Sequence, residues 1–363
     1  MNRYSHNSIR LTSVELGFLW STYMLESLVH HAHKYFVSHI EDENLKSLSQ
    51  YILDSTGCSL AYLTDLFGQE SIPLPRGITA EDIKPAAPRL FSDKFYMIYE
   101  VHMSRFALQN YSLAYTQSTC NDIKAFFEHY LNRLVLVNQQ CTELALAKGV
   151  YSRPPAISIP PQVDFVKNMS FFSGFVGKRR PLTVLEITHL FNNAETNGIG
   201  KAFITGLAQV AKSGEIRNYC LRGKAIAEKF IGLFNNVLAR EDVSRPPSYD
   251  SEVVSNTTES PFSDRMMLFH INLLNAGGFG NYGTAIAASP RTDLTLLYTR
   301  ILLQVGIYSR AGSNLMVKNG WLEQPPTMQK LTRQEIDAGH KKLLSQPAMK
   351  PLPEKRKDEQ DKT

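Results

Sequence analysis

Three glycines, Gly278, Gly280 and Gly283, give the stretch 272–285 the spacing G-x-G-x-x-G. In dinucleotide-binding proteins this pattern joins a strand to a helix, and the missing side chains let the backbone approach a pyrophosphate. Here the glycines lie well inside a predicted helix that Ser263 caps, so the pattern predicts no nucleotide site. We expect these small residues to let a neighbouring backbone approach closely, and a pocket for a small ligand is the alternative.

A metal site is the second chemistry to consider, because Glu186-x-x-His189 has the spacing of a metal-binding helix. Ferritin-like bundles hold two irons or manganeses with a Glu on each of two helices and Glu-x-x-His on the other two. Glu186 is already explained by a helix-capping box, and the ligands required on the other helices are missing. The cluster His30, His31 and His33 is expected to form a solvated helix face, with weak zinc binding by His30 and His33 as the alternative. No metal and no cofactor are therefore predicted.

The sequence shows no Ser/His/Asp, Cys/His or paired-carboxylate pattern, so no catalytic residue is predicted and we favour a non-enzymatic protein. The Asn-Tyr pairs at 110–111 and 281–282 are interpreted as part of a buried hydrogen-bond network, with a ligand-lining role as the alternative. His270 is expected to be a hydrogen-bonded histidine of the core or of an interface. The ligand or interface candidates are Asn110, Tyr111, Asn281, Tyr282, Gly278, Gly280 and His270.

An internal repeat must position all these residues, because the chain matches itself without a gap at a constant offset of about 171 positions. The matched segments are Leu11-Thr12 with Leu182-Thr183, Phe91-Ser92-Asp93 with Phe262-Ser263-Asp264, Asn110-Tyr111 with Asn281-Tyr282, and Pro154-Pro155 with Pro325-Pro326. We therefore expect two copies of one fold, at 10–157 and 181–328.

Each copy is expected to contain four long helices. A capping box starts the first helix near Thr12 or Thr183, and a Pro-bearing connection separates the second helix from the third. The fourth helix covers about 121–148 or 292–319 and ends at a glycine. Strand signals are nearly absent, so the fold class is all-α: two tandem four-helix bundles of ferritin-like topology, in which one long crossover joins two helical hairpins.

Two segments lie outside the repeats. The linker 158–180 carries several large apolar residues and is expected to lie against a bundle surface. Residues 329–363 are expected to form a short helix and a disordered charged tail.

Composition limits the partners and the compartment. The net charge is +5, without a dense basic stripe, so a nucleic-acid partner is not predicted. The four cysteines form no C-x-x-C pair, and no signal peptide is recognisable, so synthesis in the cytoplasm is expected. The uncharged stretch 266–290 could span a bilayer by length, but its Asn and His residues favour a buried helix and no membrane span. Protein partners or self-association remain open.

The sequence resembles a known family in the strings at 74–103, 175–203, 260–285, 291–308 and 319–326, which include SPFSDRMMLFHINLLNAGGFGNYGTA and NGWLEQPP. These are similar to the domain of unknown function 3231 family of spore-forming Bacillus-type bacteria, whose members typically carry two tandem copies. The resemblance covers about residues 10–328. It implies paired ferritin-like bundles, and it supplies no catalytic residue. Some relatives bear the label "putative spore coat protein".

The leading hypothesis is a non-catalytic structural or interaction protein associated with sporulation or the spore surface. The first alternative is a ferritin-like metal-binding or redox protein with a non-standard ligand set. The second is a small-molecule sensor with a pocket beside Asn281, Tyr282 and the glycines. An apolar cavity beside that segment, absent from the first copy, would favour the sensor.

Overall fold

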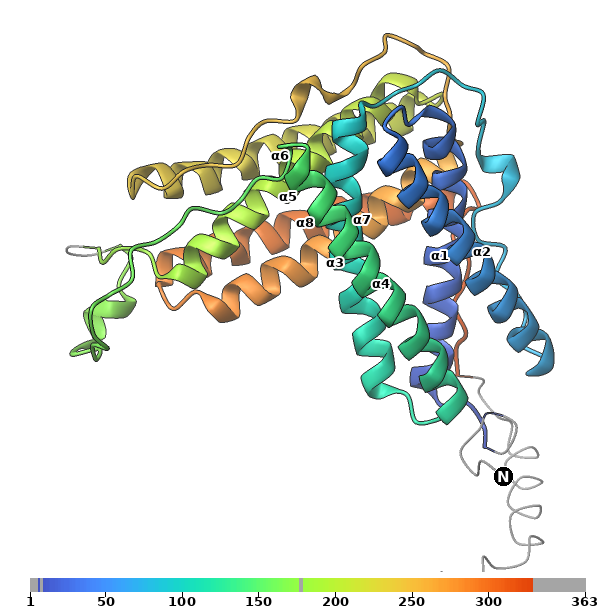
Figure 1. The fold of residues 1–363 in the computed structure, drawn as a ribbon, viewed down its shortest axis with the longest axis horizontal. Coiled ribbons are helices and arrows are strands. Elements are labelled where there is room, and N and C mark those ends of the chain that lie inside the picture. Colours follow the sequence, from blue (N-terminus) through green and yellow to red (C-terminus); the bar gives the residue numbers. More distant parts are fainter. Residues whose placement is uncertain (1–5, 7–8, 176–178, 329–363) are drawn as a thin grey trace, which may run out of the picture. The chain divides into compact units, whose positions relative to one another are not determined.

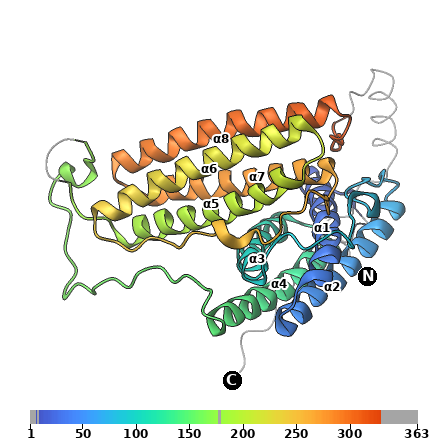
Figure 2. The ribbon, with the colours of Figure 1, turned by 90° about the horizontal axis from the view of Figure 1, so that it is seen from above.

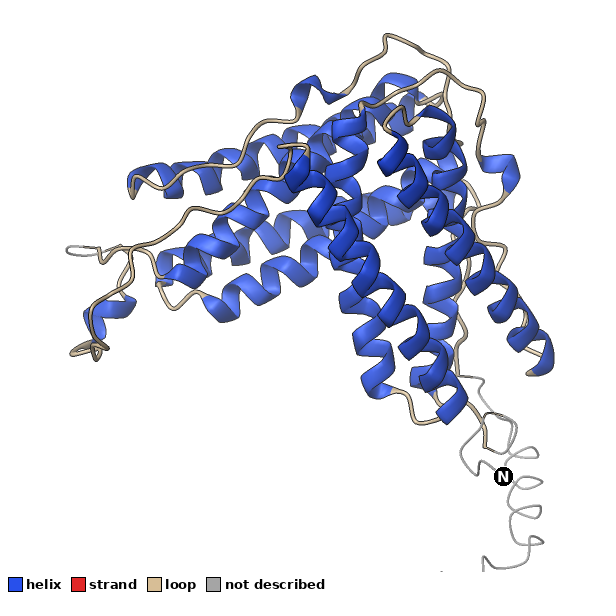
Figure 3. Cartoon of the chain, in the orientation of Figure 1, coloured by secondary structure: helices blue, strands red, loops and turns tan. Residues whose placement is uncertain are grey.

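The computed structural model describes residue 6 and residues 9–175 and 179–328, and this part of the chain is helical, with no strand beyond two isolated bridges (Figure 1, Figure 3). The prediction of two tandem four-helix bundles is confirmed. The helices are α1 (Ser13–His39), α2 (Glu43–Gln69), α3 (Asp93–Gln117), α4 (Asn121–Ala147), α5 (Val184–Val210), α6 (Gly214–Arg240), α7 (Asp264–Ala288) and α8 (Thr292–Lys318). Figure 2 shows the four helices α5–α8 lying side by side.

The predicted helix starts are present in both copies. Thr12 and Thr183 each form a capping box with the Glu three residues on. Both glutamates are fully buried, because each also accepts hydrogen bonds from the backbone at the start of the copy's fourth helix. Burial alone would raise the pKa of Glu15, but hydrogen bonds from Thr12, Cys120 and Thr119 hold that pKa at about 2. One carboxylate thus ties two helix ends together.

The contacts between helices establish one crossover in the first bundle. Residues near the start of α1 meet the end of α3, and residues near the end of α1 meet the start of α3: Glu15 accepts from Thr119 N (2.8 Å), while His33 Nε2 lies 2.9 Å from Glu100 Oε1. Helix α3 therefore runs antiparallel to α1. Since a short turn also makes α2 antiparallel to α1, α3 is parallel to α2, and the segment 70–92 must cross over.

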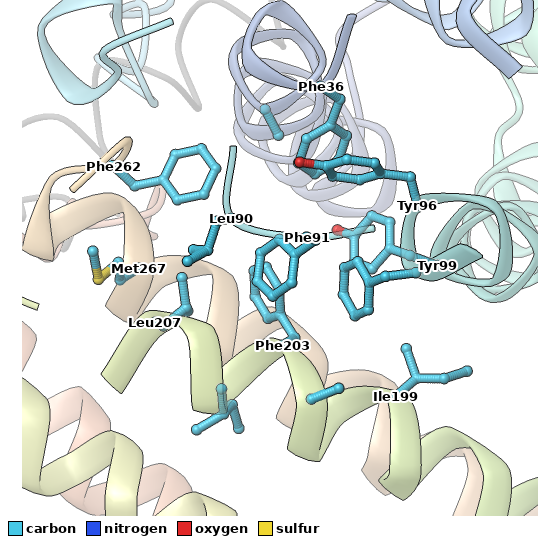
Figure 4. Close-up of a cluster of buried hydrophobic side chains, with 14 of the residues drawn as sticks. Phe36, Leu90, Phe91, Tyr96, Tyr99, Ile199, Phe203, Leu207, Phe262 and Met267 are labelled. Carbon is cyan, nitrogen blue, oxygen red and sulfur yellow. The ribbon is translucent and has the colours of Figure 1, made fainter. Parts of the chain in front are cut away.

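One hydrophobic core cluster spans both copies, and each copy also has a smaller cluster of its own. Phe203 of α5 packs between aromatic residues of the first copy, with its ring centroid 5.7 Å from that of Phe91 and 5.8 Å from that of Tyr99 (Figure 4). Leu207 and Phe262 belong to the same buried cluster. The described residues up to Gln324 accordingly form one compact unit by their contacts.

Polar contacts between the copies are reciprocal. Lys94 Nζ lies 3.0 Å from Glu252 Oε1 in the crossover of the second copy. Arg265, the equivalent of Lys94 at the offset of 171, lies with its Nη2 2.5 Å from Asp82 Oδ2 in the crossover of the first copy. Each crossover therefore reaches the third helix of the other copy, as expected for two like units related by an approximate two-fold axis.

The linker differs from the prediction. Most of its apolar side chains are exposed rather than packed on a bundle: Ile159 is 91% exposed, Val163 86% and Phe165 82%. Among its described residues, the linker contacts the second bundle near its end, where Phe172 O accepts from Thr292 Oγ1 (2.8 Å) and Arg180 pairs with Glu186. The expected packing fails because no described helix face covers residues 159–166. The predicted tail, 329–363, lies outside the described residues.

Among the helices of the described ranges, none is long and apolar enough to cross a membrane. The segment 266–290, which has the length of a span, belongs largely to α7 and contributes to the core through Met266, Met267, Leu268 and Ile271.

Candidate functional site

A cavity of about 290 Å³ lies within the second bundle, where α5, α6, α7 and α8 face α3 of the first copy. Its lining is mainly apolar. The apolar residues that surround it come from all five helices and include Met103, Phe203, Ile226, Phe230, Leu274 and Val305. The wall also includes Gln109 and Thr284, which are exposed, so the cavity reaches the surface there. We call it the second-copy cavity.

The first bundle contains a smaller cavity of about 80 Å³ at the equivalent place, the first-copy cavity. The two sets of lining residues correspond at the offset of 171: Thr56 with Ala227, and Tyr111 with Tyr282. Tyr99, Met103, Phe106 and Leu273 line both cavities, which therefore share a wall. The hollow is thus a feature of the repeated unit.

Differences in side-chain volume accompany the larger second cavity. Phe106 and Ala107 line the first-copy cavity, and their equivalents Gly277 and Gly278 line the second. Gly277 also faces Phe106 itself, since a Cβ there would lie 3.1 Å from the Phe106 ring. Because a buried void lacks the contacts that fill a packed interior, its persistence costs stability unless something occupies it.

A stacked tyrosine pair lies beside the second-copy cavity, which Tyr308 lines. The rings of Tyr219 and Tyr308 stack with centroids 4.3 Å apart, and Tyr308 Oη donates to Tyr219 O (3.1 Å). Gly223 and Gly312 make room for them, because a Cβ at either position would lie within 2.5 Å of a tyrosine oxygen. These glycines therefore serve close packing, which was the role expected of Gly278 and Gly280.

The expected packing role is wrong for Gly278 and Gly280. A Cβ at Gly280 would meet no atom within 4 Å, and one at Gly278 would meet only the Tyr282 ring of its own helix, at 3.5 Å. Gly278 lines the second-copy cavity, whereas Gly280 is exposed and outside its lining. The difference arises because they lie on different faces of α7, two residues apart.

The two tyrosines of the Asn-Tyr pairs have the same role in each copy. Tyr282 Oη accepts from Asn197 Nδ2 (2.8 Å) at the wall of the second-copy cavity, and burial raises the pKa of Tyr282 to about 12. Tyr111 donates to Glu26, the equivalent of Asn197, at the wall of the first-copy cavity. Burial raises the pKa of Glu26 to about 7. Both tyrosines thus belong to a buried hydrogen-bond network and also line a cavity.

The remaining candidates, Asn281, Asn110 and His270, lie in different places. Asn281 lines the second-copy cavity, whereas Asn110 donates to Phe106 O of its own helix (2.8 Å) and lines neither cavity. His270 is buried at the boundary between the copies, where its Nε2 lies 2.6 Å from Tyr99 Oη. This places His270 in contact with the equivalent residue of the other copy.

The expected solvated face of the α1 histidines is wrong. His33 is 2% exposed and pairs with the buried Glu100 of α3. His30 is half-buried, its Nδ1 lies 3.2 Å from Leu53 O, and burial lowers the pKa of His30 to about 4. Sequence analysis missed the buried acids Glu26 and Glu100, although each lies within an apolar helical stretch.

A second missed group lies at the wall of the second-copy cavity. His102 Nε2 lies 3.2 Å from Glu195 Oε2, and its Nδ1 lies 3.3 Å from Thr196 Oγ1. Glu195 is buried and also accepts from Tyr249 Oη (3.0 Å). A hydroxyl, an imidazole and a carboxylate in this order can perform acyl transfer in other proteins.

The contacts of Thr196 oppose that chemistry. Its hydroxyl donates to Asn192 O of its own helix (2.8 Å), so the hydroxyl proton points to the helix backbone rather than to His102. Thr196 also lies inside α5, where the backbone N–H groups are used by the helix and cannot stabilise an oxyanion. The contacts of Thr196, His102 and Glu195 therefore fit a role in stabilising the fold better than a role in acyl transfer.

Metal chemistry has no ligand set in the part of the chain that is described. There, no group of three or more His, Cys, Asp or Glu residues is placed to hold a metal ion. Glu186, the acid of the Glu-x-x-His pattern, is instead paired with Arg180 (2.7 Å).

These observations define an all-helical protein built from two fused four-helix bundles with a cavity at the same place in each. The profile of the family described as "Protein of unknown function (DUF3231)" matches the chain twice, at residues 1–163 and 170–333. The chain belongs to this family.

Two further comparisons complete this description. No curated protein matches the chain. Among solved structures, the chain is similar to a crystal structure of a "putative spore coat protein" from Bacillus halodurans, with 17% sequence identity and a TM-score of 0.39. The match covers 42% of this chain and 98% of the other.

Proposed function

We propose that the chain is a non-catalytic binding protein whose second-copy cavity receives a small, mainly apolar molecule. The observation that carries this proposal is the difference between equivalent places in one molecule, about 290 Å³ against about 80 Å³. Small-molecule sites commonly occupy about 300–1,000 Å³, and the second-copy cavity lies just below that range. It suits a ligand with one or two rings.

Burial of apolar surface would supply the binding free energy. A ligand that buries about 200 Å² of apolar surface gains about 5 kcal/mol before the costs of association. Side chains such as Phe203, Phe230 and Val305 offer that surface. Gln109 and Thr284 mark the path of entry, because both line the cavity and are exposed.

The chemistry of the wall favours binding over catalysis. The hydroxyl of Thr196 is committed to its own helix. Burial raises the pKa of Tyr282 to about 12, so this phenol stays protonated at neutral pH and serves as a hydrogen-bonding group.

Native mass spectrometry of the protein purified from its host tests the proposal. We expect a bound small molecule in the wild type, lost in Gly278→Leu, because the new side chain would enter the second-copy cavity. The matched control is Gly280→Leu, on the same helix but outside the cavity lining, which keeps the ligand. Ligand-free wild type, or equal loss in both variants, would contradict the proposal.

A structural or interaction role, associated with sporulation or the spore surface, is the second candidate. The observation that favours it is the exposed apolar linker, with Ile159, Val163 and Phe165 each more than 80% exposed. We propose that the protein is made in the cytoplasm and joins other proteins later. Pull-downs from vegetative and sporulating cells test this: spore-layer proteins recovered only from sporulating cells support it, and the same set from both counts against it.

A further inference from the structure

We infer that the ligand of the second-copy cavity is an uncharged molecule with a hydrogen-bonding carbonyl or amide head and an apolar body. This inference rests on the proposed function and adds the chemical class of the ligand. It rests on a comparison of the charged and amide side chains that line the two equivalent cavities.

The second copy has lost the ionisable groups that the first copy buries. Glu26, His33 and Glu100 line the first-copy cavity. Their equivalents at the offset of 171 are Asn197, Ile204 and Ile271, and the first two of these line the second-copy cavity. No carboxylate is found among the described residues that line the second-copy cavity. An ammonium group would therefore lack a counter-charge there, and unpaired buried charges are strongly disfavoured.

The basic residues of this wall are already paired or uncharged. Arg105 Nη2 donates to Tyr151 Oη (2.7 Å), and its guanidinium lies over the Tyr151 ring. His102 is paired with Glu195, which supplies a negative charge beside it. Burial lowers the pKa of His189, which keeps that imidazole neutral. A ligand carboxylate would have to displace one of these contacts, so an anionic head is disfavoured as well.

Amide side chains offer the hydrogen bonds instead. Asn192 on α5 and Asn281 on α7 line the second-copy cavity, and neither side chain bonds to another described residue. Asn275, also in the wall, lies beside Tyr219, but its buried Nδ2 has no acceptor at hydrogen-bonding geometry. The side-chain N–H groups of Asn192 and Asn281 can therefore donate to a ligand acceptor such as a carbonyl oxygen.

The polar and apolar parts of α5 are ordered along the helix. Asn192, Asn193 and Asn197 line its earlier turns, and Phe203 and Ile204 line its later turns beside Tyr308. A head-and-body ligand would thus place its carbonyl among the amides and its rings toward Phe203.

Isothermal titration with four probes of one shape tests the inference: naphthalene, 1-naphthamide, 1-naphthoate and 1-naphthylmethylammonium. We expect 1-naphthamide to bind at least tenfold more tightly than either ion. Asn281→Leu should weaken 1-naphthamide fivefold or more while leaving naphthalene unchanged. Asn110→Leu, the equivalent change in the first copy at a residue outside both cavities, should alter neither.

The outcomes separate the two proposals. Naphthalene binding that Gly278→Leu abolishes, without an advantage for the amide, overturns this inference and leaves the binding function standing. Equal or tighter binding of either ion also overturns the inference. No binding of any probe to the wild type overturns both proposals.

Discussion

Tyr99 Oη lies 2.6 Å from His270 Nε2, and these two residues occupy the same position in the two copies. Equivalent residues meet only where an axis relating the copies passes between them, so this contact marks an approximate two-fold axis inside one chain. Phe106 and Gly277, also equivalent, meet further along the same helices. The copies therefore pack as a symmetric dimer does, and each could change independently after fusion.

The contact at the axis predicts an acid-sensitive stability. Burial lowers the pKa of His270 to about 3, against 6.5 for the free imidazole. Between these two pKa values His270 is protonated in the unfolded state but not in the folded state. Folding stability therefore falls as the pH drops below about 6.5. When the pH is lowered from 7 to 5, the free energy of unfolding should fall by about 1–2 kcal/mol less in His270→Gln than in the wild type. Urea unfolding at the two pH values measures this, and equal losses would contradict it.

Glu26 predicts the opposite slope. Burial raises its pKa to about 7, so the folded state keeps a proton that the unfolded state releases above 4.5. The contribution of Glu26 to folding stability is therefore fully present below pH 4.5, and it is lost as the pH rises through 7. Glu26→Gln introduces an amide like that of Asn197 in the second copy. When the pH is raised from 5 to 8, its free energy of unfolding should increase by about 2 kcal/mol relative to that of the wild type. Exposed Glu143→Gln is the control, and a similar gain there would refute the assignment.

The two reciprocal ion pairs between the copies should contribute differently to the free energy of unfolding. Arg265 and Asp82 are both buried, so Arg265→Met leaves an unpaired buried carboxylate and should cost about 3–5 kcal/mol of unfolding free energy. The Lys94 side chain is 40% exposed, and Lys94→Met should cost about 1 kcal/mol or less. Chemical denaturation of both variants compares them. Equal costs would show that burial does not set the energy of these pairs.

Two helical glycines should respond to alanine with opposite signs. A Cβ at Gly206 would lie 2.6 Å from the ring of Phe91, which is fully buried between the copies. Gly206→Ala should therefore destabilise the protein by about 1–3 kcal/mol. Gly232 meets no atom within 4 Å and is exposed, so Gly232→Ala should stabilise its helix by up to about 1 kcal/mol. Thermal unfolding gives both signs, and a stabilising Gly206→Ala would contradict the packing at the axis.

The sequence predicts the architecture well because the evidence for it is local or repeated. The capping boxes at Thr12 and Thr183 and the terminal glycines Gly149 and Gly320 fix helix ends, and each is present. The constant offset predicts two like bundles. It does not predict that the copies bury Phe203 in a shared core, because that depends on contacts distant in sequence.

The cavity was harder to predict. It accompanies small volume differences at equivalent positions, such as Phe106 and Gly277, and their effect appears only after packing. Gly278 and Gly280 look alike in sequence, yet only Gly278 lines the cavity, because helix rotation separates two neighbouring positions. The buried acids could have been suspected, since Glu26 interrupts the apolar stripe of its helix.

Xenon pressurisation of crystals tests the central claim most directly, because xenon enters apolar cavities without needing a polar partner. The account predicts a xenon atom in the second-copy cavity, beside Gly278 and Phe203, in the wild type and in Gly280→Leu, and none there in Gly278→Leu. Side chains filling that space in the wild type, or xenon retained in Gly278→Leu, would contradict it.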